Sequence, residues 1–240
     1  MHAATTPMRP SLALFGIEPW RAALEFASLK VSGVPVTASG DGHPVIIFPG
    51  LASDGRAVAP LRKYCTRLGY SAMDWGRGRN NGPTGDIGTW LDALAEHVEN
   101  LMQGSDQPAT LIGWSLGGLY ARESAKLLPG RVRQVITIGT PFNASADHTN
   151  VGWLYRLVSG TKAAIAPALA AKLRTPPPVP TVSIYSRSDG IVAWQTCLHA
   201  KGTHATDIEV RGSHIGMGWN PAVLRVVGER LQSAQTVHAH

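Results

Sequence analysis

The stretch LIGWSLGGLY, residues Leu111–Tyr120, places one serine between glycines at the end of an apolar run. The residues before Ser115 favour a buried strand and those after it favour a helix, so the serine stands at a sharp strand-to-helix turn. Such a G-x-S-x-G turn holds a hydroxyl clear of the sheet, with small residues where side chains would clash. The amide of Leu116 opens the helix, where a backbone N–H and the helix dipole can stabilise an oxyanion. The stretch therefore predicts a nucleophilic serine.

From His43 onward, short apolar runs alternate with helix-like patterns, which is typical of a parallel sheet covered by helices on both faces. We expect six strands, at Pro44–Phe48, Ser71–Trp75, Ala109–Trp114, Val132–Gly139, Thr181–Ser186 and Thr206–Gly212. Apolar residues at helical spacing predict four helices, at Arg56–Leu68, Ile87–Met102, Gly117–Leu128 and Pro221–Leu231. The pattern predicts an α/β fold with a mostly parallel central sheet of about six strands flanked by helices.

Two segments lie outside this alternation. Residues 11–32 read as an N-terminal helix, with Trp20, Leu24 and Phe26 offering an apolar face. We expect this helix to pack on the body of the protein; a membrane-surface anchor is the alternative, but its polar face is poor in Lys and Arg. The insert over residues 142–180 is long for a connection and is predicted to form a small helical lid or cap.

Composition limits the class of protein. The chain has 240 residues, 44% hydrophobic and 16% charged, which fits a single soluble domain over residues 1–240. Cys65 and Cys197 lack the spacing of a metal or redox motif and are expected to be free thiols. The net charge of +6 comes from scattered Lys and Arg residues, which favours a solvated surface over a nucleic-acid partner or an anionic membrane surface.

Targeting and cofactor signals are not found in the sequence. The first residues lack a secretory h-region, and no run approaches about 18 apolar residues, so we expect a cytoplasmic protein without stable membrane insertion. We recognise no phosphate loop, dinucleotide fingerprint or metal-ligand cluster and predict no cofactor and no metal. The oligomeric state stays open.

A nucleophilic serine needs a histidine to take its proton and a carboxylate to orient that histidine. Asp189 follows a predicted strand, and His214 follows the last one, so both should lie at the edge of the sheet that carries Ser115. Asp189 has an alternative interpretation as a turn residue before Gly190. The competing acids and histidines are Asp147, Asp207, His199, His204, His238 and His240.

Taken together, these motifs resemble the α/β-hydrolase family, and within it the small lipase and carboxylesterase-like members, over about His43 to Leu231. The family orders its catalytic residues as serine, acid and histidine, which matches this chain. The resemblance also implies a second oxyanion N–H in the loop after an early strand. The matching stretch is IIFPGLASDG, Ile46–Gly55, where Leu51 is the expected donor and Pro49 replaces the familiar histidine.

The resemblance implies an esterase or lipase that cleaves carboxylic esters with an apolar acyl chain through an acyl-serine. Its partner would be a small-molecule or lipid-like acyl ester. The residues that would line the acyl pocket are Trp114, Trp153, Leu154, Tyr155 and Leu157, although plain packing explains them equally well. The alternatives are an acyltransferase, thioesterase or amidase with the same triad, or a non-catalytic binding protein of this fold.

Overall fold

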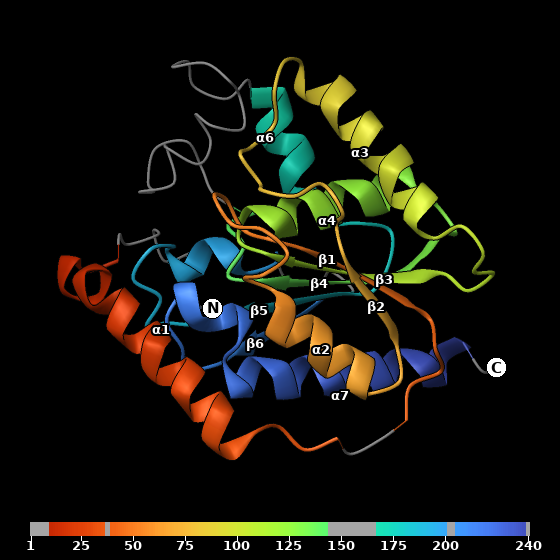
Figure 1. Cartoon of the computed structure of the whole chain (residues 1–240). Helices are drawn as coiled ribbons and strands as arrows, with labels where there is room; N and C mark the ends of the chain where they lie inside the picture. The colour runs from red at the N-terminus through yellow and green to blue at the C-terminus, as the bar shows by residue number, and fades with distance from the viewer. Residues whose placement is uncertain (1–9, 37–38, 144–166, 201–204, 239–240) are drawn as a thin grey trace.

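A six-stranded sheet forms the centre of the protein (Figure 1). The computed structural model describes residues 10–36, 39–143, 167–200 and 205–238. The strands are β1 (Pro44–Phe48), β2 (Ser71–Asp74), β3 (Ala109–Trp114), β4 (Val132–Ile138), β5 (Thr181–Tyr185) and β6 (Ala205–Glu209). Their order is β2-β1-β3-β4-β5-β6, and every neighbouring pair is parallel. The prediction of about six mostly parallel strands is confirmed, and the sheet is wholly parallel.

Helices cover both faces of the sheet, as the continuous apolar strands require. One layer contains α3 (Ile87–Leu101), α4 (Leu116–Leu127) and α6 (Pro167–Arg174), and the other contains α1 (Leu12–Ser32), α2 (Ala59–Arg67) and α7 (Pro221–His238) (Figure 1). Two 3-10 turns, η1 (Trp194–Cys197) and η2 (Ile215–Gly218), follow β5 and β6.

Alternate residues of β1 divide the core between these layers. Ile46 and Phe48 pack with α3 and α4, whereas Val45 and Ile47 pack with α2 and α7. Successive side chains of a strand point to opposite faces, so these four fully buried residues contribute to both cores. The sheet is therefore held rigidly between two packed layers, and its strand ends are fixed points on which a site can be built.

The direction in which successive strands are added to the sheet reverses between β1 and β3. β1 pairs with β2 on one side and with β3 on the other, and the chain then continues outward to β6. In an open α/β sheet, the crevice at the carboxyl ends of the strands beside such a switch point is the usual ligand site. The turn at Ser115 follows β3 directly, and the loop containing Leu51 follows β1.

Helix α1 forms where it is predicted, but the expected orientation of its apolar residues is wrong. Trp20 is 76% exposed and Leu24 is 70% exposed, whereas Glu18 is 1% exposed. The physical reason is that the carboxylates of α1 accept hydrogen bonds from backbone N–H groups of the body, as described below. Periodicity identifies the two faces of a helix, but it does not decide which of them packs inward.

The structure describes both cysteines and part of the predicted lid. Cys65 and Cys197 are buried free thiols, as predicted. Most of the predicted lid, residues 144–166, lies outside the described residues, and α6 falls in its remainder. Within the described ranges, no helix is long and apolar enough to cross a membrane, and no cluster of three or more His, Cys, Asp or Glu side chains has the arrangement to hold a metal ion.

Candidate active site

Ser115 lies in a strained turn between β3 and α4. Its φ of 53° and ψ of −120° are unusual for a residue with a side chain, and they turn the chain sharply from strand to helix. The Ser115 N–H donates to the Ile138 carbonyl at 2.8 Å, and the Ser115 carbonyl accepts from Thr140 Oγ1 at 3.0 Å. Both contacts come from the end of β4, so the neighbouring strand holds the strained residue in place.

Close packing requires the small residues around this turn. A Cβ on Gly113 would overlap the backbone of Gly117 and Gly118, and a Cβ on Gly117 would overlap the carbonyl of Phe48. A Cβ on Gly118 would overlap Thr140. These glycines therefore allow α4 to begin directly against β1 and β4, which explains the G-x-S-x-G spacing in physical terms.

The side chains of Ser115, His214 and Asp189 form a continuous hydrogen-bonded chain. Ser115 Oγ lies 3.0 Å from His214 Nε2, and His214 Nδ1 lies 2.7 Å from Asp189 Oδ2. All three residues are buried, with exposed fractions between 3% and 7%. Asp189 Oδ1 accepts from the backbone N–H groups of Ile191 and Val192 at 2.8 and 2.6 Å, which leaves Oδ2 directed at the imidazole.

Two opposing effects set the pKa of His214. Burial disfavours the charged imidazolium, but the charge and hydrogen bond of Asp189 favour it, and Glu18 adds a further negative charge. The result is a pKa raised above the ordinary histidine value. An imidazole in this setting accepts a proton readily, as a general base toward Ser115 must.

The loop after β1 approaches Ser115 closely. A Cβ on Gly50 would lie 3.3 Å from the Trp114 ring and 3.5 Å from Ser115 Cβ, so the Gly50 backbone packs against Ser115. Within the described part of the chain, the Leu51 and Leu116 amides donate no hydrogen bond. Leu116 follows Ser115 directly and Leu51 follows Gly50, and an unbonded backbone N–H is the kind of donor that an oxyanion hole requires.

Asn80 fixes the loop after β1 through hydrogen bonds, and sequence reasoning missed this residue. It is fully buried, and its Nδ2 donates to the Pro49 carbonyl at 2.8 Å. Its backbone carbonyl accepts from Ala52 at 2.7 Å, and its N–H donates to Ser53 at 2.8 Å. Ala52 has a φ of 58°, so these bonds fix the loop in a conformation that a free segment would avoid.

Helix α1 contacts both loops that carry the partners of Ser115, and sequence reasoning missed these contacts as well. Glu18 accepts from the N–H groups of Gly190 at 2.8 Å and Ile215 at 3.0 Å, the residues that follow Asp189 and His214. Arg21 donates to the Ser188 carbonyl and hydroxyl.

Further along α1, Glu25 accepts from the backbone N–H and the hydroxyl of Ser213 at 2.7 and 3.1 Å. Burial raises the pKa of this carboxyl, although its bonds to Ser213 oppose the shift. Ser213 precedes His214 and Ile215 follows it, so α1 bonds to the residues on either side of His214 in the sequence.

The remaining predicted residues are placed as follows. Trp114 is buried, and its indole N–H donates to the His214 carbonyl at 3.1 Å. His199 pairs with Asp207 at 2.7 Å and with Arg122 at 3.2 Å, so these rival residues form a separate cluster. The predicted positions outside the described residues are Asp147, Trp153, Leu154, Tyr155, Leu157, His204 and His240. The side chain of His238 is not described either.

Comparisons with known proteins agree with this architecture. The family profile described as the alpha/beta hydrolase family matches residues 39–228. Over 110 residues the chain is 29% identical to the pimeloyl-[acyl-carrier protein] methyl ester esterase of Shewanella woodyi. The aligned region covers 45% of this chain and 40% of that protein. The chain thus aligns with less than half the length of this relative.

Solved structures share the fold at low identity. An alpha/beta superfamily hydrolase from Oenococcus oeni is 16% identical with a TM-score of 0.60, over 82% of this chain and 94% of that one. Aspergillus fumigatus lipase B is 17% identical with a TM-score of 0.59, over 83% of this chain and 55% of that one.

Proposed function

Because the chain belongs to the α/β-hydrolase family, we propose that it is a serine esterase that cleaves carboxylic esters with an apolar acyl chain. The observation that carries this proposal is the hydrogen-bonded chain from Ser115 through His214 to Asp189. Its three members have the residue types, order and contacts that acyl transfer through a serine requires.

In the first half of the reaction, Ser115 Oγ attacks the ester carbonyl carbon while its proton passes to His214 Nε2. The carbonyl oxygen becomes an oxyanion, which the Leu51 and Leu116 amides stabilise. His214 then gives its proton to the leaving alcohol as the carbon–oxygen bond breaks, and the acyl group stays on Ser115 as an ester.

In the second half, water replaces the alcohol. His214 takes a proton from the water as its oxygen attacks the acyl carbon, and the same two amides stabilise the second oxyanion. The intermediate collapses as His214 returns the proton to Ser115 Oγ, which releases the carboxylic acid. Asp189 holds the imidazole in its orientation and stabilises the imidazolium.

The choice of an ester as substrate is supported by the relatives. Four matching proteins bear the name pimeloyl-[acyl-carrier protein] methyl ester esterase. That name describes the cleavage of a simple ester on an acyl chain, and we extend only this reaction class to the present protein. Transfer to another alcohol, or cleavage of a thioester or amide, would use the same triad, and product analysis with competing nucleophiles separates these reactions.

The test is the rate of p-nitrophenyl ester hydrolysis from acetyl to palmitoyl, with Ser115→Ala measured beside the wild-type protein. We expect kcat to fall by at least about 10⁴-fold in the variant, because the nucleophile is removed. An unchanged circular dichroism spectrum and an active-site fluorophosphonate that labels only the wild-type protein are the controls. Hydrolysis that persists in Ser115→Ala would refute the proposal.

A further inference from the structure

Helix α1 turns its polar side toward the two loops that hold the acid and the histidine. Its acidic residues are Glu18 and Glu25, and both bond to backbone of those loops. Glu18 is the more central, because one carboxylate joins the residue after Asp189 to the residue after His214. These loops follow different strands, β5 and β6.

The loops are shaped to receive α1. A Cβ on Gly190 would lie 2.7 Å from the backbone of Leu14, and a Cβ on Gly216 would overlap the Glu25 carboxylate. The Trp219 indole N–H also donates to the Ala22 carbonyl at 2.9 Å. Both loops therefore leave room for this helix and meet it through specific polar bonds.

We propose that α1 is a clasp in which Glu18 is a positioning residue: it fixes the Asp189 loop against the His214 loop and sets the charge around the imidazole. The proposal rests on the proposed esterase function. Glu18 touches neither substrate nor reacting atoms in this account. Its effect passes through the geometry of the Asp189–His214 pair and through the negative charge that it places near His214. The Arg21 guanidinium lies 3.4 Å from the same carboxylate and offsets part of that charge.

Two variants of Glu18 separate geometry from charge. Glu18→Gln keeps the shape but removes the charge and one acceptor, whereas Glu18→Asp keeps the charge but shortens its reach. We expect kcat to fall about 10- to 100-fold in both, because small displacements of catalytic groups are costly. The Glu18→Gln change should also move the acidic limb of the kcat/KM profile to lower pH, since a neutral Gln no longer stabilises the imidazolium. Glu18→Asp should leave that limb near its wild-type position.

Glu96→Gln on the exposed side of α3 is the matched control and should match the wild-type protein in rate and profile. Thermal unfolding of each variant distinguishes a local effect from loss of the fold. A wild-type kcat and pH profile in Glu18→Gln, beside an inactive Ser115→Ala, would overturn the clasp alone. An active Ser115→Ala would instead overturn the esterase on which the clasp rests.

The opposite face of α1 supports a second, independent inference. This face is apolar and exposed, and its residues, 47–87% exposed, are Leu12, Ile17, Trp20, Leu24 and Val31. Because Glu18 and Glu25 point into the body, no acidic side chain of α1 lies among them. Figure 1 shows α1 running along the outside of the molecule.

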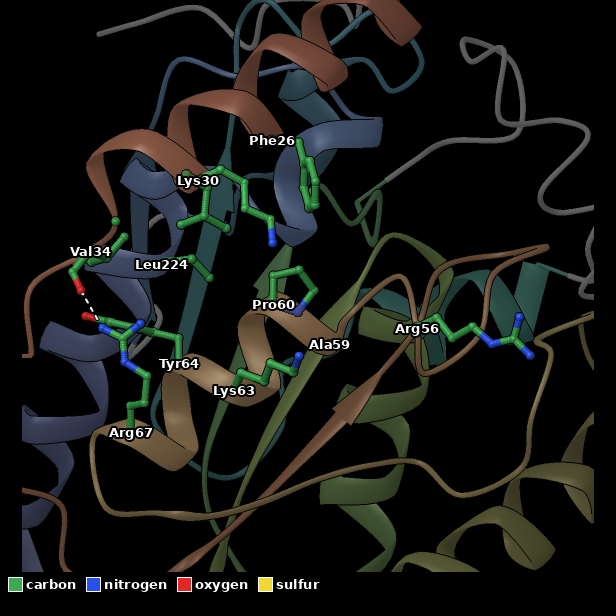
Figure 2. Close-up of a pocket in the computed structure, with 12 residues that line it drawn as sticks. Phe26, Lys30, Val34, Arg56, Ala59, Pro60, Lys63, Tyr64, Arg67 and Leu224 are labelled. Atoms are coloured by element: carbon green, nitrogen blue, oxygen red, sulfur yellow. Dashed lines mark hydrogen bonds between the residues drawn. The ribbon is translucent and has the colours of Figure 1, made fainter.

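A groove with cationic side chains adjoins the C-terminal end of this helix. It has a volume of about 390 Å³ and lies among α1, α2 and α7, with Phe26, Leu29, Pro60 and Leu224 among its lining residues. Lys30 and Lys63 approach it from opposite sides (Figure 2). Neither ammonium group pairs with a carboxylate of the described chain. Arg67 bonds to the Val34 carbonyl at 2.9 Å and adds a third positive charge.

We infer that α1 docks on an anionic lipid surface, with its apolar face in the headgroup boundary and Lys30 and Lys63 against the phosphates. Helix α1 is itself poor in Lys and Arg, but Lys63 and Arg67 of α2 add cations beside its Lys30. An apolar helix face with neighbouring cations is the chemistry that binds such surfaces. A second copy of the chain fits less well, because two molecules of net charge +6 would bring these cations together. The helix would lie in the surface and not cross it.

Sedimentation with vesicles tests this inference. The wild-type protein should pellet with equimolar phosphatidylglycerol and phosphatidylcholine and stay in solution with phosphatidylcholine alone. Trp20→Ser with Leu24→Ser should weaken binding more than about tenfold, through lost apolar contact. Lys30→Ser and Lys63→Ser should each weaken it roughly fivefold. Leu127→Ser, on the exposed side of α4, is the control and should bind like the wild-type protein.

Three outcomes would overturn the docking inference. The protein would stay in solution with anionic vesicles, or the Trp20 and Leu24 changes would leave binding intact. Alternatively, analytical ultracentrifugation would show self-association that the same changes abolish, which would assign this face to a second copy. None of these outcomes bears on ester hydrolysis, so this inference stands or falls separately from the clasp.

Discussion

At the scale of single residues, the candidate site depends on one carboxylate that is almost completely buried. Asp189 is 3% exposed, yet two backbone N–H groups and the His214 imidazole satisfy its oxygens. A buried charge is tolerated only when it is paired and hydrogen-bonded in this way. The same charge holds the pKa of His214 above its ordinary value in spite of burial.

The exchange of Asp189 for asparagine tests this charge. We expect Asp189→Asn to lower kcat by on the order of 10⁴-fold, because the amide no longer stabilises the imidazolium or enforces its tautomer. The base form of His214 is neutral, so activity rises with pH through its pKa. Loss of the Asp189 charge lowers that pKa, and the acidic limb of the kcat/KM profile should move to lower pH.

Asp207→Asn is the matched control, because Asp207 also pairs with a histidine, His199, in a separate cluster. Its pH profile should follow that of the wild-type enzyme. An acidic limb that moves equally in both variants, or in neither, would contradict the pairing of Asp189 with His214 as the proposed general base.

Sequence alone locates the three members of the hydrogen-bonded Ser115–His214–Asp189 chain, because each follows the end of a strand. Ser115 follows β3, Asp189 follows β5 and His214 follows β6, and parallel strands end at one edge. Their supporting residues have no such signal. The bond from Gly190 to Glu18 spans 172 positions, and no local pattern marks a buried glutamate in a helix whose side chains are mostly exposed.

At the scale of elements, the loop after β1 is held by a residue from another loop. Asn80 follows β2, yet its side chain and backbone bond to residues 49, 52 and 53. Sequence identifies the loop through its glycine but not its support, because the two segments meet only when β1 and β2 pair. The conformation of Leu51, and hence of a proposed oxyanion donor, depends on this contact.

We therefore expect Asn80→Ala to lower kcat about 10- to 100-fold with a smaller change in KM, because a displaced amide weakens transition-state stabilisation above all. Loss of the buried bonds should also cost about 1–3 kcal/mol of unfolding free energy. Steady-state kinetics and urea unfolding measure the two effects. Asn100→Ala, on the exposed end of α3, is the control and should change neither quantity. An Asn80→Ala protein with wild-type kcat would show that the loop after β1 keeps its conformation without Asn80.

At the scale of the whole molecule, the sheet and α1 are stabilised by different interactions. The strands contribute side chains to two apolar cores. The alternation of short apolar runs with helix-like segments along the sequence predicts this layered arrangement. Helix α1 buries only Glu18 and Ala22 and is held chiefly by carboxylates that meet backbone amides. Elements with little buried apolar area open at a lower free-energy cost than the core. Helix α1 should therefore detach from the protein before the central sheet unfolds.

This difference predicts two separate transitions in urea. Ester hydrolysis should fall at a lower urea concentration than the far-ultraviolet circular dichroism of the sheet and its covering helices, because detachment of α1 releases the loops of Asp189 and His214. Glu18→Gln should move the activity transition to still lower urea and leave the spectroscopic transition nearly unchanged. If activity and spectrum are lost together in the wild-type protein, and Glu18→Gln shifts both equally, α1 unfolds as part of the main cooperative unit and its bonds stabilise the entire fold.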